Sequence, residues 1–172
     1  MAGDRRRPER TLDPARLGDH LDRLYRAAWA LCGSHEDAED LVQETYARVL
    51  ARPRLLRNDD DLGYLLRALR NTFLTRRGAE SRRPRPGPLP DRLDLVADPR
   101  APQPETALEA GELYAAVAAL PDEFRDVLVA VDVAGLSYKE AARALRIREG
   151  TVMSRLYRAR QQVVRRIGGG ST

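Results

Sequence analysis

Arginine, amide and hydroxyl side chains gather near the carboxyl end of the sequence, in a pattern suited to binding nucleic acid. Residues 146–166 hold seven arginines and a single acid, Glu149. On a helix with 100° per residue, Val152 and Leu156 share an inward stripe, so the polar side chains lie opposite and beside it. These outward and flanking residues are Thr151, Met153, Ser154, Arg155, Tyr157, Arg158, Arg160 and Gln161. Such a surface can read base edges in a major groove and contact phosphates.

A second set of side chains suited to DNA lies in the middle of the sequence. Residues 67–85 hold seven arginines and one acid. Tyr64, Arg67, Asn71 and Thr75 recur at three- and four-residue steps, so they share one side of a helix. An aromatic ring, amide hydrogen bonds and positive charge together suit a separated DNA strand. The alternative interpretation is a solvated helix face, with Tyr64 as a packing residue.

The distribution of charge indicates more than one partner. The chain as a whole carries a net charge of +4. Residues 34–44, however, hold five acids and no lysine or arginine. Two separate basic segments and one acidic segment indicate several different partner surfaces.

The residue inventory excludes several kinds of catalytic or metal site. One cysteine, Cys32, and two histidines, His20 and His35, allow neither an internal disulfide nor a structural zinc site. The sequence has no Ser/His/Asp, Cys/His, paired-carboxylate or glycine-rich phosphate arrangement. No stretch approaches about 18 uninterrupted apolar residues. We therefore expect a cytoplasmic protein that inserts into no membrane, needs no metal or cofactor, and is not an enzyme.

Helical periodicity runs through almost the whole chain, and convincing period-two alternation is missing. The sequence therefore predicts an all-α fold. Three amphipathic helices are expected within residues 11–77, where they can close one small core. Seven prolines interrupt residues 78–104, which predicts a flexible, Pro/Arg-rich linker. Helical patterns resume over residues 105–167, so we expect two small helical domains joined by that linker.

The second domain contains a recognisable motif. Residues 137–160 read SYKEAARALRIREGTVMSRLYRAR, with the spacing of a helix-turn-helix. The stretch 150–160, GTVMSRLYRAR, resembles region 4 of bacterial sigma factors of the extracytoplasmic-function group, in which G-T-V-x-S-R-L-x-R-A-R is typical. Arg146 departs from the pattern, because relatives often have glycine in the turn. Either a left-handed backbone there strains Arg146 by roughly 1 kcal/mol, or the turn differs locally.

The acidic segment resembles another part of the same family. Residues 37–50, DAEDLVQETYARVL, resemble region 2.2. The resemblance implies that Asp40, Gln43 and Glu44 dock on the clamp helices of the polymerase β′ subunit. The alternative is that acids near a helix start merely favour the helix dipole. That alternative suits Glu44 less well, because Glu44 lies about two turns into the helix.

The third predicted helix completes the resemblance. Residues 61–77, DLGYLLRALRNTFLTRR, resemble regions 2.3 and 2.4, with Tyr64 where relatives often have tryptophan and Asn71 at a typical asparagine. In relatives this helix and the loop before it capture a flipped base of the minus-ten element. The resemblance therefore implies that Asn58 and Asp61 belong to the minus-ten site with the helix face described above.

The resemblance implies a bacterial transcription initiation factor that binds core RNA polymerase through the β′ clamp helices and the β flap. It would bind the minus-thirty-five element as duplex and the minus-ten element as a single strand, with no obligate homo-oligomer. Family members are commonly held by an anti-sigma factor, and residues 71–73 and 151–154 resemble members with zinc-containing anti-sigma partners. The alternatives are a stand-alone helix-turn-helix regulator that binds palindromic duplex as a dimer, a nuclease, and a helical adaptor.

Overall fold

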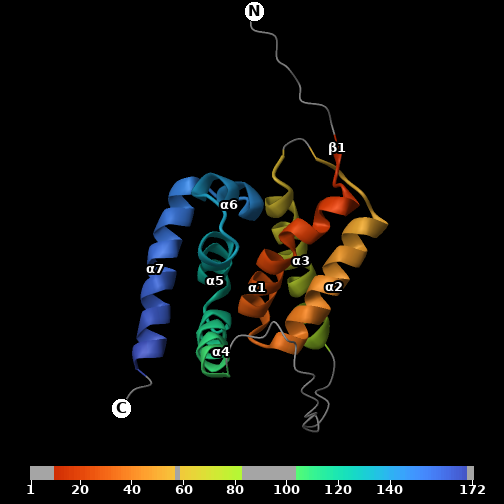
Figure 1. The fold of residues 1–172 in the computed structure, drawn as a ribbon. Helices are drawn as coiled ribbons and strands as arrows, with labels where there is room; N and C mark the ends of the chain where they lie inside the picture. Colours follow the sequence, from red (N-terminus) through yellow and green to blue (C-terminus); the bar gives the residue numbers. More distant parts are fainter. Residues whose placement is uncertain (1–9, 57–58, 83–103, 170–172) are drawn as a thin grey trace, which may run out of the picture.

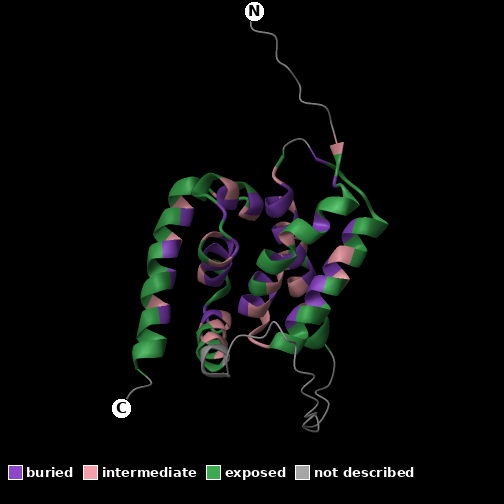
Figure 2. Cartoon of the chain, in the orientation of Figure 1, coloured by how far each residue is buried: buried purple, intermediate pink, exposed green. Residues whose placement is uncertain are grey.

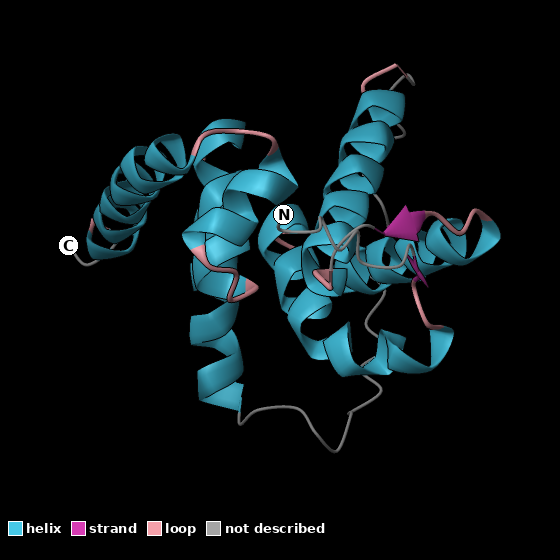
Figure 3. Cartoon of the chain, turned by 90° about the horizontal axis from the view of Figure 1, so that it is seen from above, coloured by secondary structure: helices cyan, strands magenta, loops and turns pink. Residues whose placement is uncertain are grey.

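Helices form most of the molecule (Figures 1 and 3). The computed structural model describes residues 10–56, 59–82 and 104–169. Within these ranges, strand pairing is confined to β1 (Arg10–Thr11) and β2 (Leu55–Leu56), which are antiparallel with Arg10 opposite Leu56. The all-α prediction is confirmed.

The first half of the chain contains a 3-10 helix and three α-helices. In order they are η1 (Pro14–His20), α1 (Leu21–Cys32), α2 (His35–Ala51) and α3 (Asp61–Glu80). Gly33 follows α1 with φ 75°, a left-handed conformation that glycine adopts without strain. Ser34 then caps α2, and its hydroxyl accepts a hydrogen bond from the Asp37 N–H. Asp60 caps α3, because its carboxylate accepts a hydrogen bond of 2.8 Å from the Gly63 N–H.

The second half contains four α-helices and a π-helical turn. In order they are α4 (Pro104–Ala118), α5 (Asp122–Leu128), η2 (Val129–Val133), α6 (Tyr138–Leu145) and α7 (Glu149–Gly168). A capping box between Ser137 and Glu140 begins α6. Arg146 ends α6 with φ 57° and ψ 43°, and no other non-glycine residue in the described ranges has a positive φ. The left-handed turn considered from the sequence is therefore present, with a strain of roughly 1 kcal/mol.

The two halves pack against each other around one shared hydrophobic core. Helix α1 contacts α2 and α3 on one side and α4 and η2 on the other, while α3 contacts α6. Buried side chains from both halves contribute, including Leu24, Leu65, Val127 and Leu156. Helix α3 continues to Glu80, beyond the predicted boundary at 77, and most of the predicted linker lies outside the described residues. As a result, α3 of the first half and α6 of the helix-turn-helix lie against each other.

Candidate nucleic-acid and polymerase interfaces

Helix α7 has one buried side and one exposed side (Figure 2). Its inward stripe is formed by Val152, Leu156, Ala159 and Val163, all buried. On the outward side Tyr157 is 65% exposed, and its hydroxyl accepts a hydrogen bond of 2.8 Å from the Gln161 amide. Met153, Ser154 and Arg158 are exposed on the same helix, and Thr151 is half-buried. The predicted duplex-reading surface therefore lies on the open side of the helix-turn-helix.

Two flanking arginines of α7 are already paired within the second half. Arg160 donates two hydrogen bonds to Asp132, at 2.9 and 2.7 Å, and these raise the pKa of the Arg160 guanidinium. Arg155 lies 3.2 Å from the Glu123 carboxylate. Both side chains keep partial exposure, so they can exchange an acid for a phosphate. Arg158 has no ion pair with the described part of the chain.

The predicted single-strand face of α3 is partly occupied by the second half. Arg67 donates hydrogen bonds of 3.0 Å to the Ala144 carbonyl and 2.7 Å to the Arg143 carbonyl. These carbonyls lie in the last turn of α6, where a cation is favoured by the helix dipole. Asn71 and Thr75 are exposed on the same side of α3. Among the residues of this face, Arg67 is therefore the one whose side chain is hydrogen-bonded to the second half.

Of the remaining minus-ten candidates, Tyr64 and Asp61 are less exposed than Asn71 and Thr75. Tyr64 is half-buried and packs against the core, as the alternative interpretation from the sequence expects in part. Asp61 is only 3% exposed, and its carboxylate accepts a hydrogen bond from Arg10. Asp61 is thus held in the interior instead of on the DNA-facing surface. Asn58 lies outside the described residues.

Two arginines of α3 that the sequence reasoning missed connect the halves. Arg70 donates a hydrogen bond of 2.6 Å to Asp126, which is 7% exposed. Arg77 donates two hydrogen bonds to Asp122, at 2.9 and 2.6 Å, and this pairing lowers the pKa of Asp122 to about 2. In the sequence, only the opposite charges of these arginines and aspartates indicated that they could pair. Charge alone could not show that α3 and α5 pack together.

The acidic surface of α2 faces away from the core. Asp40 and Gln43 are exposed, and Glu44 is half-buried beside them. Glu44 accepts a hydrogen bond of 2.6 Å from Arg48, and Arg76 lies 3.6 Å from its other oxygen. The three predicted docking residues therefore share an outward side of α2, with one of them positioned by arginines.

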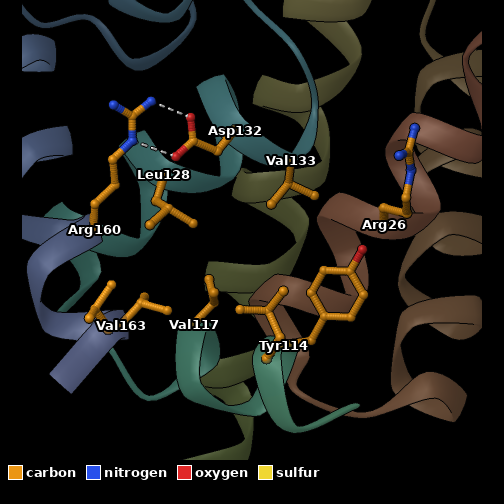
Figure 4. Close-up of a pocket in the computed structure, with 10 residues that line it drawn as sticks. Arg26, Tyr114, Val117, Leu128, Asp132, Val133, Arg160 and Val163 are labelled. Carbon is orange, nitrogen blue, oxygen red and sulfur yellow. Dashed lines mark hydrogen bonds and ion pairs between the residues drawn. The ribbon is translucent and has the colours of Figure 1, made fainter. Parts of the chain in front are cut away.

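A cavity of about 350 Å³ lies between α1, α4, the α5–η2 segment and the carboxyl-terminal half of α7 (Figure 4). Apolar side chains of α4, α5 and η2 line it, and the Arg160–Asp132 pair and Arg26 lie at its edge. On the α4 and α7 sides, Leu113 is 42% exposed and Val164 is 69% exposed. This apolar hollow depends on packing between distant segments, so the sequence pattern did not predict it.

A cluster of aromatic rings lies where α1 of the first half meets α4 of the second half. Trp29 lies 4.7 Å from Tyr114 of α4, measured between ring centroids. His35 contacts Trp29 edge-on at 5.6 Å. Within the described ranges, no group of three or more His, Cys, Asp or Glu residues is arranged to hold a metal ion. None of the helices there has the length and apolar character needed to span a bilayer.

A helix-turn-helix with an exposed polar and basic face, packed on a helical domain with an acidic helix surface, is the arrangement expected of a sigma-type transcription factor. The Sigma-70 region 2 family model matches residues 17–83, and the Sigma-70, region 4 model matches residues 110–163. The chain belongs to the family of extracytoplasmic-function (ECF) RNA polymerase sigma factors. The family predicted from the two motifs is confirmed.

Three curated relatives support this assignment. The chain is 40% identical to "ECF RNA polymerase sigma factor SigE" of Mycolicibacterium smegmatis, over 84% of this chain and 57% of the relative. It is 35% identical to EcfG of Rhodopseudomonas palustris over 81% of this chain and 76% of the relative. Identity to SigM of Mycobacterium tuberculosis is also 35%, over 87% of this chain and 74% of the relative. The chain thus spans little more than half the length of SigE.

Two solved structures have a similar fold. The sigma factor RpoE in complex with the anti-sigma factor NepR, from Bartonella quintana, superposes with a TM-score of 0.67 and 25% identity, over 90% of this chain and 95% of that chain. CnrH in complex with the cytosolic domain of CnrY gives a TM-score of 0.61 at 21% identity, over 90% of this chain and 86% of that chain. The second likeness bears on the fold alone.

Proposed function

We propose that this chain guides core RNA polymerase by reading the minus-thirty-five duplex with α7 and holding the minus-ten strand on α3. The observation that carries the proposal is the exposed polar face of α7, opposite a stripe in which Val152 and Ala159 are fully buried. A helix with this division can enter a major groove without losing its packing. Phosphodiester chemistry belongs to the polymerase, so the chain itself is not an enzyme, and its place of action is the cytoplasm.

The minus-ten strand is held by Tyr64, Asn71 and Thr75, with Arg67 on a phosphate. A base that leaves the duplex regains stacking on an aromatic ring and hydrogen bonds to an amide. Because two N–H groups of Arg67, on Nε and Nη2, are engaged by α6 carbonyls, the two halves separate before the full Arg67 guanidinium binds DNA. Loading onto polymerase supplies the free energy for that separation.

The acidic surface of α2, which we define as Asp40, Gln43 and Glu44, binds core polymerase. The exposed carboxylate of Asp40 and the half-buried carboxylate of Glu44 on the same outward side of α2 suit a basic protein surface, here the clamp helices of β′. The double substitution Asp40→Arg with Glu44→Arg is expected to weaken core binding by at least about tenfold, or roughly 1.4 kcal/mol. The measurement is a titration of purified core polymerase against the full chain.

A matched control separates docking from a general effect of charge. Glu109→Arg with Glu112→Arg makes the same change of charge on exposed positions of α4. This control is expected to bind core polymerase like the wild type. Equal affinity of both double variants for core, with normal circular dichroism, would remove α2 from the docking surface.

An anti-sigma factor is the partner proposed for the cavity between α4, η2 and α7. An apolar hollow of about 350 Å³ with exposed Leu113 and Val164 beside it suits the apolar face of a helix. The relative RpoE is described in complex with the anti-sigma factor NepR, which supports a partner of this class. Val164→Glu is expected to weaken co-purification of such a partner. Zinc in the partner remains a prediction from the short matches at 71–73 and 151–154.

A further inference from the structure

An amino-terminal arm, residues 10–16, is built into the end of the molecule where α3 begins. The arm precedes the segment that the region 2 model matches, which starts at residue 17. It is nonetheless ordered by β1, whose Arg10 and Thr11 pair with Leu56 and Leu55 of β2. The side chains of Leu12 and Leu56 are both buried, so the arm is anchored by apolar packing as well.

Arg10 connects this arm to both acids that flank the start of α3. Its Nε lies 3.3 Å from Asp59 Oδ1, and its Nη2 donates a hydrogen bond to Asp61 Oδ1. Asp61 is 3% exposed, and Arg16 lies 3.9 Å from its second oxygen. A branched guanidinium can hold two carboxylates at once, which a lysine ammonium does less well. The pKa of Arg10 is raised, chiefly by the hydrogen bond to Asp61.

These contacts offset the repulsion between carboxylates and DNA phosphates at the predicted minus-ten site. Asp59 and Asp60 directly precede α3 and the buried Asp61 is its first residue, so three successive acids place negative charge where a phosphate backbone would approach. Arg143 of α6 lies 3.9 Å from Asp60, but it belongs to the second half. When the halves separate, that arginine leaves, whereas Arg10 stays with the first half.

A polar cavity of about 240 Å³ lies beside the same acids. Arg16, His20 and Arg23 line it from the first half, and Gly135, Leu136 and Glu140 line it from the second. Departure of the second half therefore opens this hollow toward a DNA strand next to the acids that Arg10 holds.

We propose that Arg10 is a positioning residue for minus-ten recognition, which neutralises Asp59 and Asp61 and fixes the entrance to α3. The inference rests on the proposed use of α3 for the minus-ten strand. It adds a residue of the arm, outside the matched region, to the groups that decide how well this strand binds.

The test uses holoenzyme assembled from core polymerase and the full chain carrying Arg10→Gln. The probe is a forked promoter template whose minus-ten element is single-stranded, alongside the same template with a substituted minus-ten sequence. Affinity for the first template is expected to fall about tenfold, and the preference over the second template is expected to shrink. Affinity for core polymerase stays unchanged. Arg10→Lys, which retains the charge, recovers part of the loss.

Two comparisons make the result decisive. Arg52→Gln removes the same charge from an exposed position after α2 and is expected to leave both templates bound as in the wild type. Tyr64→Ala with Asn71→Ala tests the α3 assignment itself. Wild-type binding by Arg10→Gln together with a loss in the double variant would overturn the role of Arg10 and leave the α3 assignment intact. A fall in unfolding temperature and core affinity with unchanged preference between templates would also overturn it, as a purely structural effect.

Discussion

The proposed duplex-reading face of α7 and the proposed single-strand face of α3 differ in what lies against them. On α7, Tyr157 and Arg158 point into open solvent although the halves are packed together. On α3, Arg67 is bound to two carbonyls of α6. The same packing of the halves thus leaves the proposed duplex-reading face accessible and engages Arg67 on the proposed single-strand face. We infer that the two surfaces become available in sequence, α7 before α3.

The contacts that close the molecule are suited to reversible opening. The Arg77–Asp122 pair is about half-exposed on both sides, and such pairs contribute at most about 1 kcal/mol. The Arg70–Asp126 pair is more buried, so its loss costs more. Binding to a large partner such as polymerase can offset costs of this size.

The largest expected effect concerns the α3 face. Tyr64→Ala with Asn71→Ala removes a stacking ring and an amide, and base stacking alone is worth about 1–3 kcal/mol. Open-complex formation on a duplex promoter is expected to fall by about ten- to a hundredfold. A promoter with a pre-melted minus-ten bubble is expected to recover part of this activity. Equal melting of the duplex by variant and wild-type holoenzyme would contradict the DNA role and show that Tyr64 and Asn71 only form a solvated helix face.

The next effect concerns the α7 face. Arg158→Ala is expected to cost roughly 1–3 kcal/mol at one minus-thirty-five position, because its exposed guanidinium is free to reach a base edge. Binding to a panel of substituted minus-thirty-five duplexes measures this position by position. Arg165→Ala, two turns further along α7, removes the same charge and is expected to act alike on all sequences. A uniform loss for Arg158→Ala would make it a phosphate contact.

A substitution in the second half can expose the α3 face without altering α3. Asp126→Asn removes the charge that holds Arg70, and a lost charge-assisted hydrogen bond is worth about 1.5–3 kcal/mol. The free chain is expected to bind a single-stranded minus-ten oligonucleotide several-fold more tightly, with duplex binding by α7 unchanged. Trp29, the chain's single tryptophan, contacts Tyr114 across the boundary, so its emission reports the opening.

Asp132→Asn is the matched control for that experiment. Asp132 pairs with Arg160 inside the second half, so this change removes the same charge without touching a bond between α3 and α5. Its Trp29 emission is expected to match the wild type. Similar emission changes in both variants would show that the Arg70–Asp126 pair does not hold the halves together.

The smallest effect is a dependence of closure on acid pH. Pairing with Arg77 lowers the pKa of Asp122 to about 2, so the ionised carboxylate favours the closed form. Asp122 also accepts a hydrogen bond of 2.8 Å from Arg125 of its own half, so only the Arg77 part of the shift favours closure, and that part is lost as pH falls toward about 2. Since the pair is half-exposed, the effect stays below about 1 kcal/mol. Trp29 emission between pH 5 and pH 2 should change less in Asp122→Asn than in the wild type.

Local sequence information determined the helices, the turn and the family. The 3.6-residue periodicity of α7 separates Val152 and Leu156 from Ser154 and Arg158, and the structure confirms this division. The cap at Ser34 and the left-handed turn at Arg146 likewise depend on near neighbours in the chain. The periodicity and the cap are set by backbone geometry and by hydrogen bonds over a few residues, so the sequence alone specifies them, whereas the sequence left two turn geometries open at Arg146.

Only the tertiary structure decided which charged groups are engaged. Arg67 and its acceptor Ala144 are 77 positions apart, and Arg70 and Asp126 are 56 apart. Asp61 reads as a surface acid in the sequence, yet packing buries it beneath Arg10. The sequence pattern shows which face of a helix is polar, but the partner of that face depends on how the halves pack. Burial and low local dielectric then decide which ion pairs persist, and both are properties of the packed molecule.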